Sequence, residues 1–137
     1  MPLILSTVES DVGYLTLNCP EKHNALSAAL VNELIAQLAA LGKQSVRAVV
    51  LRSQPGAKVW SAGHDVTELP TDGRDPLGWD DPLRHVIREI ENFPAPVIAI
   101  SPRLSDSKAM PYGIDLKPGD LTLADITAKA VACLDNP

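Results

Sequence analysis

The apolar run at residues 46–51, which reads Val-Arg-Ala-Val-Val-Leu, restricts the fold more than any other segment of this sequence. β-Branched and aliphatic residues dominate it without the regular polar alternation of a half-exposed strand, a pattern typical of strands buried on both faces. Residues 97–100, Val-Ile-Ala-Ile, form a second run of the same kind. Helices usually cover sheets built from such strands, so we expect an α/β fold with crossover helices.

The segment before the first run predicts a β-hairpin. Residues 3–8 are β-like, residues 9–13 supply turn residues, and residues 14–19 alternate apolar and polar side chains. Together with two helices, these segments give the order strand, strand, helix, strand, helix, strand. We therefore expect an open sheet of four or five strands with both helices packed on it.

Two helices have clear start signals. Ser27 is a suitable N-cap for the first helix, and Gly42 is its expected C-cap. Asp81 is the expected N-cap of the second helix, with Pro82 at the first helical position. The apolar stripe of the first helix is Leu30, Leu34, Leu38 and Leu41, and that of the second is Leu83, Val86, Ile87 and Ile90.

The 137 residues suit one domain followed by a tail. Residues 1–100 are expected to form the folded part, and residues 101–120, rich in proline, serine and charge, a linker. Residues 121–137 are expected to form a C-terminal helix with no assigned role.

Composition and charge exclude several classes of partner. The net charge is −5 and no basic cluster occurs, so neither nucleic acid nor a membrane surface is expected to bind. No apolar segment is long enough to span a bilayer and no signal-peptide pattern is present, so we expect a cytoplasmic protein. Cys19 and Cys133 lack metal or redox spacing and are expected to be buried free thiols.

Residues 60–69, Trp-Ser-Ala-Gly-His-Asp-Val-Thr-Glu-Leu, are the main candidate for a functional site. Ala62 and Gly63 are small enough for a backbone to approach a ligand closely, and N–H groups in such a turn can bind an oxyanion. A glycine that only forms a turn is the more common case. His64 has no second histidine at ligand spacing, so no metal site is expected. We interpret its imidazole as a partly buried group bonded to its neighbours.

Two short motifs occur in a specific order and spacing. The first is Asn24-Ala25-Leu26-Ser27 after a Pro-x-Lys turn, and the second is Ser61-Ala62-Gly63-His64-Asp65. In this combination they resemble the crotonase superfamily of enoyl-CoA hydratases and isomerases. Residues 73–84 and 93–98 are similar to its methylmalonyl-CoA decarboxylase branch, and the resemblance covers residues 1–100.

The resemblance implies a crotonase-like ββα spiral, truncated to its N-terminal half, that takes a CoA thioester as substrate and needs no other cofactor. The backbone N–H of His64 would be the catalytic group, one of two oxyanion-hole donors that stabilise a thioester enolate during decarboxylation. One such donor lowers the barrier by about 3 to 4 kcal/mol. Family members form trimers or hexamers, so a homo-oligomer is expected. The implied CoA contacts, mainly through backbone atoms, are Lys22, Ala25, Leu26, Ala62, Gly63, His64, Asp65 and Val66.

The sequence departs from this family after Ile100. Family members continue into a glycine-rich turn that supplies the second donor, whereas here Ser101 and Pro102 follow, and proline has no N–H. We therefore expect an acyl-CoA-handling homologue with impaired catalysis. The alternative is a non-catalytic protein that binds CoA esters or crotonase subunits. A third reading is a fragment that does not fold stably alone, because its apolar edges stay uncovered.

Overall fold

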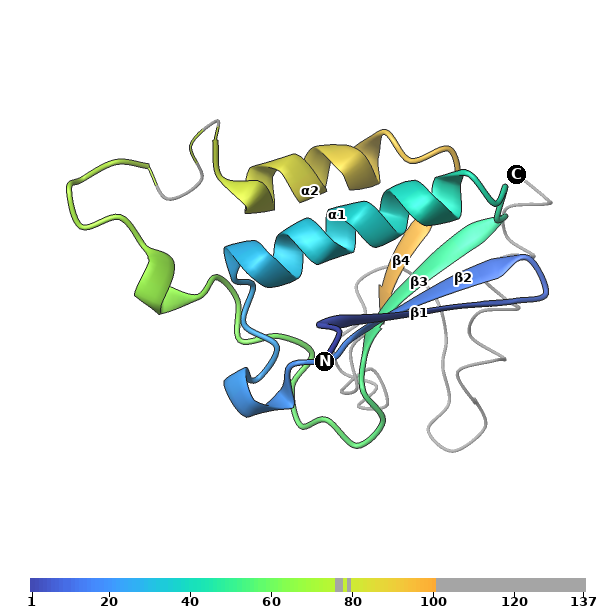
Figure 1. The fold of residues 1–137 in the computed structure, drawn as a ribbon, viewed down its shortest axis with the longest axis horizontal. Helices are drawn as coiled ribbons and strands as arrows, with labels where there is room; N and C mark the ends of the chain where they lie inside the picture. The colour runs from blue at the N-terminus through green and yellow to red at the C-terminus, as the bar shows by residue number, and fades with distance from the viewer. Residues whose placement is uncertain (76–77, 79, 101–137) are drawn as a thin grey trace, which may run out of the picture.

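The four strands found among the described residues form one sheet, and both long helices pack on the same face of it (Figure 1). A computed structural model describes residues 1–75, 78 and 80–100. The elements follow the expected order of an α/β fold. They are β1 (Ile4–Glu9), β2 (Val12–Leu17), η1 (Pro20–Lys22), α1 (Ala28–Gly42), β3 (Ala48–Ser53), η2 (Val66–Glu68), α2 (Pro82–Glu91) and β4 (Val97–Ile100).

The sheet combines one hairpin with two parallel crossovers. β1 pairs antiparallel with β2 through a tight turn at Ser10 and Asp11, which have φ angles of 49° and 63°. Turns with two positive φ angles match the twist of a hairpin. β2, β3 and β4 are parallel, in the spatial order β1-β2-β3-β4. α1 connects β2 to β3, and α2 connects β3 to β4.

The burial of β3 explains the apolar run from which we predicted it. Val49 and Leu51 pack against the helices, in one core with Leu15 and Leu17 of β2. Val50, on the opposite face of the sheet, is fully buried in a second cluster with Val12 and Ile100. Apolar residues are therefore needed at successive positions, which removes the polar alternation. The strand itself begins at Ala48, two residues later than the run.

Both predicted helix starts are confirmed. The Ser27 hydroxyl accepts a hydrogen bond from the N–H of Leu30 at 3.3 Å, and one Asp81 carboxylate oxygen accepts from the N–H of Leu83 at 2.8 Å. The stripe of α1 is buried as expected, with each leucine at most 3% exposed. In α2 the stripe holds for Val86, which is buried against α1, but not for Ile87, which is 45% exposed. α1 lies along one side of α2 only, so one stripe of α2 is covered.

Two further predictions were wrong in detail. Gly42 is the last residue of α1 and not its C-cap, which is Lys43 in a right-handed conformation. The helix thus ends without a left-handed residue at this point, and the positive φ of 55° comes later, at Ser45. β4 was expected to be buried, yet among its residues Ile100 is buried and Ala99 is exposed. Within the described part of the chain, β4 has a neighbour, β3, on one edge only.

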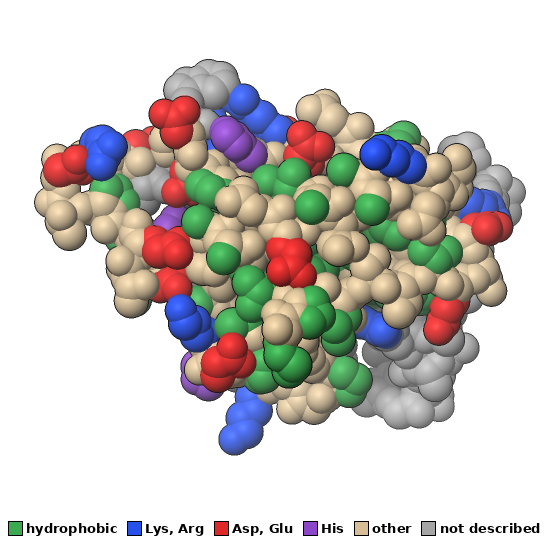
Figure 2. Space-filling view, in the orientation of Figure 1, with side chains coloured by type: hydrophobic (Ala, Val, Ile, Leu, Met, Phe, Trp, Pro, Cys, Tyr) green, Lys and Arg blue, Asp and Glu red, His purple; other side chains and the backbone are tan. Residues whose placement is uncertain are grey.

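The face of the molecule seen in Figure 2 carries interspersed acidic, basic and apolar side chains. Within residues 1–75, 78 and 80–100, neither helix combines the length and apolar character that a bilayer crossing requires. Cys19 is buried with a free thiol, as predicted. The predicted linker, the predicted C-terminal helix and Cys133 lie outside the described residues.

Candidate functional site

Two loops meet at the N-terminal end of α1, and backbone hydrogen bonds join them. The N–H of Leu26 donates to the carbonyl oxygen of Gly63 at 2.7 Å, and the N–H of Asp65 donates to the carbonyl oxygen of Leu26 at 3.3 Å. These bonds form an isolated parallel bridge between Leu26 and His64. The turn before α1 and the loop after β3, which carry the two sequence motifs, are therefore one structural unit.

The buried side chain of Asn24 fixes the first loop to the second. Its amide oxygen accepts from the N–H of Cys19 at 2.9 Å, and its amide nitrogen donates to the carbonyl oxygen of Trp60 at 3.1 Å. The Ser61 hydroxyl donates in return to the carbonyl oxygen of Asn24 at 2.7 Å. Asn24 has a φ of 53°, a left-handed conformation that asparagine adopts more readily than most residues. Asparagine therefore serves this position through both its backbone and its amide.

Gly63 is required by its backbone conformation. Its φ is 90°, and no atom lies within 4 Å of the place where a Cβ would stand. A side chain would therefore be strained by the backbone angle and not by crowding. The N–H of Gly63 donates to the Ser61 hydroxyl oxygen at 3.0 Å. Gly63 thus adopts the left-handed conformation that glycine tolerates, and close approach of a ligand at this glycine stays a prediction.

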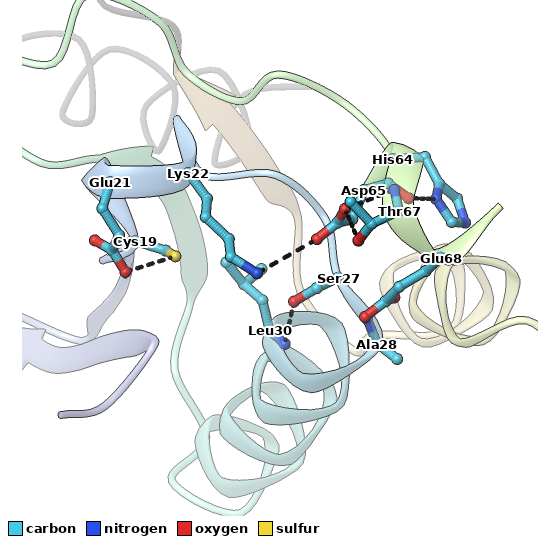
Figure 3. A network of polar contacts seen from close by, with 10 residues as sticks. All are labelled: Cys19, Glu21, Lys22, Ser27, Ala28, Leu30, His64, Asp65, Thr67 and Glu68. Carbon is cyan, nitrogen blue, oxygen red and sulfur yellow. Dashed lines mark hydrogen bonds and ion pairs between the residues drawn. The ribbon is translucent and has the colours of Figure 1, made fainter.

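The carboxylate of Asp65 organises the start of η2 (Figure 3). One of its oxygens accepts from the N–H of Thr67 at 3.0 Å and from the Thr67 hydroxyl at 2.7 Å. The other lies 3.7 Å from the ammonium nitrogen of Lys22, on the exposed turn of the first loop. The bonds from the hydroxyl and N–H of Thr67, with the charge of Lys22, lower the pKa of Asp65 below its ordinary 3.8. Asp65 is therefore ionised at neutral pH and holds both loops.

Glu68 connects η2 to the start of α1. Its carboxylate accepts from the N–H of Ala28 at 2.7 Å, next to the cap that Ser27 provides (Figure 3). The first N–H groups of a helix lack partners within the helix, so a carboxylate there satisfies a free donor and faces the positive end of the helix dipole. No sequence pattern near Glu68 indicates this contact, because the two partners are 40 residues apart.

The imidazole of His64 lies between the site loop and α2. Its Nδ1 is 3.0 Å from the carbonyl oxygen of Asp65, and its Nε2 is 3.2 Å from a carboxylate oxygen of Asp81. The bond to the Asp65 carbonyl and the bond to Asp81 raise the pKa of His64 above its ordinary 6.5. The interpretation of His64 as a partly buried group bonded to its neighbours is confirmed. The sequence identified Asp81 as a helix cap but not as the partner of His64.

A pocket of about 300 Å³ opens between the two loops. Of the residues that the resemblance implies for CoA contact, Leu26 and Gly63 do not line it and instead form the backbone bridge. Thr67 lines it but was not predicted. The lining residues are Lys22, Ala25, Ala62, His64, Asp65, Val66 and Thr67.

A second pocket, of about 450 Å³, shares Asp81 with the contact to His64 and is also lined by Pro82 and Pro70. Across the described part of the chain, no group of three or more histidine, cysteine, aspartate or glutamate side chains is arranged to hold a metal ion. The wall of the first pocket offers backbone N–H groups and three charged or titratable side chains, those of Lys22, His64 and Asp65.

Comparison with known proteins identifies what this arrangement is similar to. The sequence pattern of the enoyl-CoA hydratase/isomerase family matches residues 7–101. Methylmalonyl-CoA decarboxylase of Escherichia coli K12 is 45% identical over 89 residues, which are 65% of this chain and 34% of that protein. An enoyl-CoA isomerase/hydratase of Zymoseptoria tritici is 35% identical over 94 residues, which are 65% of this chain and 30% of that protein.

Solved structures give the same result. The structure of a methylmalonyl-CoA decarboxylase complexed with 2S-carboxypropyl CoA matches with a TM-score of 0.67 and 41% identity, over 71% of this chain and 37% of that one. An enoyl-CoA hydratase of Mycobacterium smegmatis matches with a TM-score of 0.60 and 36% identity, over 72% and 39%. The chain thus spans about a third of the length of the curated relatives it matches. The chain belongs to the enoyl-CoA hydratase/isomerase family, and its described part matches about a third of the crotonase fold seen in the solved structures.

Proposed function

We propose that this chain binds acyl-CoA thioesters in the pocket between its two loops and that the N–H of His64 donates to the thioester oxygen. The observation that carries the proposal is the bridge between Leu26 and His64. In a parallel bridge the bonds to the partner come from the residues on either side of His64, so its own N–H points away from Leu26. Among the described residues nothing accepts from that N–H. It is therefore a fixed donor at the pocket wall.

The rest of the ligand would follow the exposed surface of the first loop. Lys22 lies at the rim with 62% of its side chain exposed, and Ala25 lies beside it on the pocket wall. An ammonium at this place suits the phosphates of the CoA nucleotide, although Asp65 neutralises part of its charge. The small side chain of Ala62 lets the backbone approach the ligand. Ala62, Asp65 and Val66 would then contact the ligand through their backbone atoms.

The reaction that fits this donor is decarboxylation through a thioester enolate. In methylmalonyl-CoA the C–C bond to the carboxylate would break, CO₂ would leave, and the electron pair would pass to the thioester oxygen as an enolate. A proton from solvent would then add to the α carbon, forming a new C–H bond and giving propionyl-CoA. Two convergent donors are needed for full stabilisation, and the described residues offer one, at His64. Loss of one donor costs about 10² to 10³ in rate. We therefore propose that the 137-residue chain decarboxylates at least about a hundredfold slower than a full-length relative.

Calorimetric titration with propionyl-CoA tests binding, and mass-spectrometric measurement of CO₂ release from methylmalonyl-CoA tests turnover. Gly63→Ala should weaken binding by about five- to tenfold, since relaxation of the strained alanine would shift the N–H of His64 and lose a hydrogen bond of about 1 to 1.5 kcal/mol. Gly56→Ala is the matched control, because Gly56 has a φ of 80° with equal open space but does not line the pocket. Equal effects of both substitutions would contradict the proposed site.

The second candidate function, a protein that binds CoA esters without turning them over, is favoured by the same single donor. Binding with no detectable CO₂ release would select it, and turnover equal to that of a full-length relative would contradict both the impairment and this alternative. We further propose a cytoplasmic location and a homo-oligomer. Sedimentation velocity of the purified chain tests the second point.

A further inference from the structure

The two ring nitrogens of His64 both face oxygens that can only accept hydrogen bonds. Nδ1 lies 3.0 Å from a backbone carbonyl oxygen, that of Asp65. Nε2 lies 3.2 Å from an oxygen of the Asp81 carboxylate, whose other oxygen already accepts from the N–H of Leu83. A neutral imidazole has one donor and one acceptor, whereas an imidazolium has two donors. Only the protonated ring makes both bonds.

The charges around the ring favour the same state. Asp81, at the start of α2, contributes a hydrogen bond and an opposite charge, and Glu68 of η2 contributes a second negative charge. The carboxylate of Asp65 is bound to Lys22, so the nearest cation on the first loop is already paired. The side chain of His64 is 18% exposed and that of Asp81 is 22% exposed, so solvent screens the pair only in part.

We propose that protonated His64 and Asp81 form a pH-dependent clamp that ties the site loop to the start of α2 and so positions the backbone N–H of His64. The pair acts through position and does not touch the reacting atoms. The consequence for ligand binding rests on the proposed function, whereas the clamp itself does not.

The direction of the pH effect follows from the raised pKa of His64. A group whose pKa is higher in the folded state contributes its full stabilisation below its unfolded value, near 6.5 for histidine. That contribution is lost as the pH rises through the folded value, which lies above 6.5. The clamp is therefore closed in mildly acidic solution and weakens in alkaline solution.

NMR titration of the histidine Cε1–H signals of the intact chain tests the clamp directly. The signal of His64 is assigned by its disappearance in His64→Gln, and in the parent protein it should titrate above pH 6.5. Asp81→Asn keeps a good N-cap but removes the carboxylate, so His64 should then titrate at a clearly lower pH. Asp80→Asn, at the exposed neighbouring carboxylate, should leave the titration unchanged.

A His64 midpoint at or below pH 6.5 in the parent, or the same midpoint in Asp81→Asn, would overturn the clamp. Should circular dichroism show that Asp81→Asn does not fold, the titration midpoint of His64 in the parent alone decides.

The second measurement is the affinity for propionyl-CoA between pH 5.5 and 8.5. It is expressed as the ratio of the affinity of Asp81→Asn to that of the parent, which cancels the ionisation of CoA itself. The variant should bind propionyl-CoA a few-fold more weakly than the parent at low pH and equally well at high pH. A pH-independent ratio overturns the positioning role, and absence of binding in both proteins contradicts the proposed function while the NMR result still decides the clamp.

Discussion

The side-chain amide of Asn24 donates to the carbonyl oxygen of Trp60 at 3.1 Å, across 36 residues of sequence. Asn24 is 1% exposed, and the bond itself is partly buried. It joins the turn before α1 to the start of the loop that carries Gly63 and His64. The geometry of the candidate site therefore depends on a residue whose side chain does not line the pocket.

Replacing Asn24 with alanine should destabilise the protein by about 2 to 3 kcal/mol. The N–H of Cys19 would be left buried without its partner, which costs about 1 to 2 kcal/mol, and the partly buried carbonyl of Trp60 would lose a hydrogen bond worth about 1 kcal/mol. Urea unfolding measures the change. Asn32→Ala, at an exposed position in the first turns of α1, is the control and should stay within about 0.5 kcal/mol of the parent. Equal stability of the two variants would contradict the role of Asn24.

The same substitution should have opposite effects at two glycines. A Cβ on Gly13 would stand 2.7 Å from a methyl carbon of buried Leu41, so Gly13→Ala should destabilise by about 1 to 3 kcal/mol. A Cβ on Gly42 would meet Phe93 at an ordinary 3.5 Å, so Gly42→Ala should stabilise the end of α1 by up to about 1 kcal/mol. Thermal unfolding of the two variants measures both signs. Stabilisation by Gly13→Ala would show that Leu41 moves freely, against the packing described above.

The thiol of Cys19 should react slowly in the folded protein. Burial, a hydrogen bond to Glu21 at 3.1 Å and the charge of Glu21 raise the pKa of Cys19 above its ordinary 9.0. The thiolate is the reactive form, and each unit of pKa lowers its fraction about tenfold. Alkylation by iodoacetamide at pH 8, followed by mass spectrometry of the peptide that contains Cys19, should be slower in the folded protein than in denaturant, because burial limits access and the raised pKa lowers the thiolate fraction. Equal rates would mean that the thiol is accessible and ionised in the folded state.

Asp65 should make the free energy of unfolding fall more steeply as the pH is lowered into the acid range. Its pKa is lowered in the folded state, so its contribution is present above pH 3.8 and is lost as the pH falls through the lower folded value. Asp65→Asn retains a capping oxygen for Thr67 but has no charge. The stability difference between parent and variant, from urea unfolding at pH 6 down to pH 2.5, should therefore shrink as the pH falls. A difference that stays constant would assign the effect to hydrogen bonding alone.

Sequence reasoning predicted those parts of the fold whose signals are local. Ser27 and Asp81 cap the helices that they were expected to start, because a cap is formed within three residues of its helix. The leucine stripe of α1 is buried because its spacing fits one face of a helix. The start of β3 was placed two residues early, because buried Val46 continues the apolar pattern although the strand begins only at Ala48.

The contacts that build the site could not be predicted in this way. Glu68 reaches Ala28 across 40 residues, and Asp81 reaches His64 across 17, so neither pair leaves a local pattern. The resemblance indicated which segments form the candidate site, because the order and spacing of the two motifs can be read from a single sequence. It did not indicate which side chains hold the segments together. Those side chains fix the positions of the segments, and their partners can be identified only in the folded structure.

The carboxylate of Glu68 at the first turn of α1 also affects how anions can bind at this helix. A helix start is a natural phosphate receptor, since its free N–H groups and its dipole attract anions. In this chain an internal anion occupies that receptor, through the N–H of Ala28. A phosphorylated ligand arriving at α1 must compete with a tethered carboxylate that is present at very high local concentration. Anion binding through the N–H of Ala28 would therefore require displacement of Glu68, whereas the ammonium of Lys22 is exposed at the pocket rim.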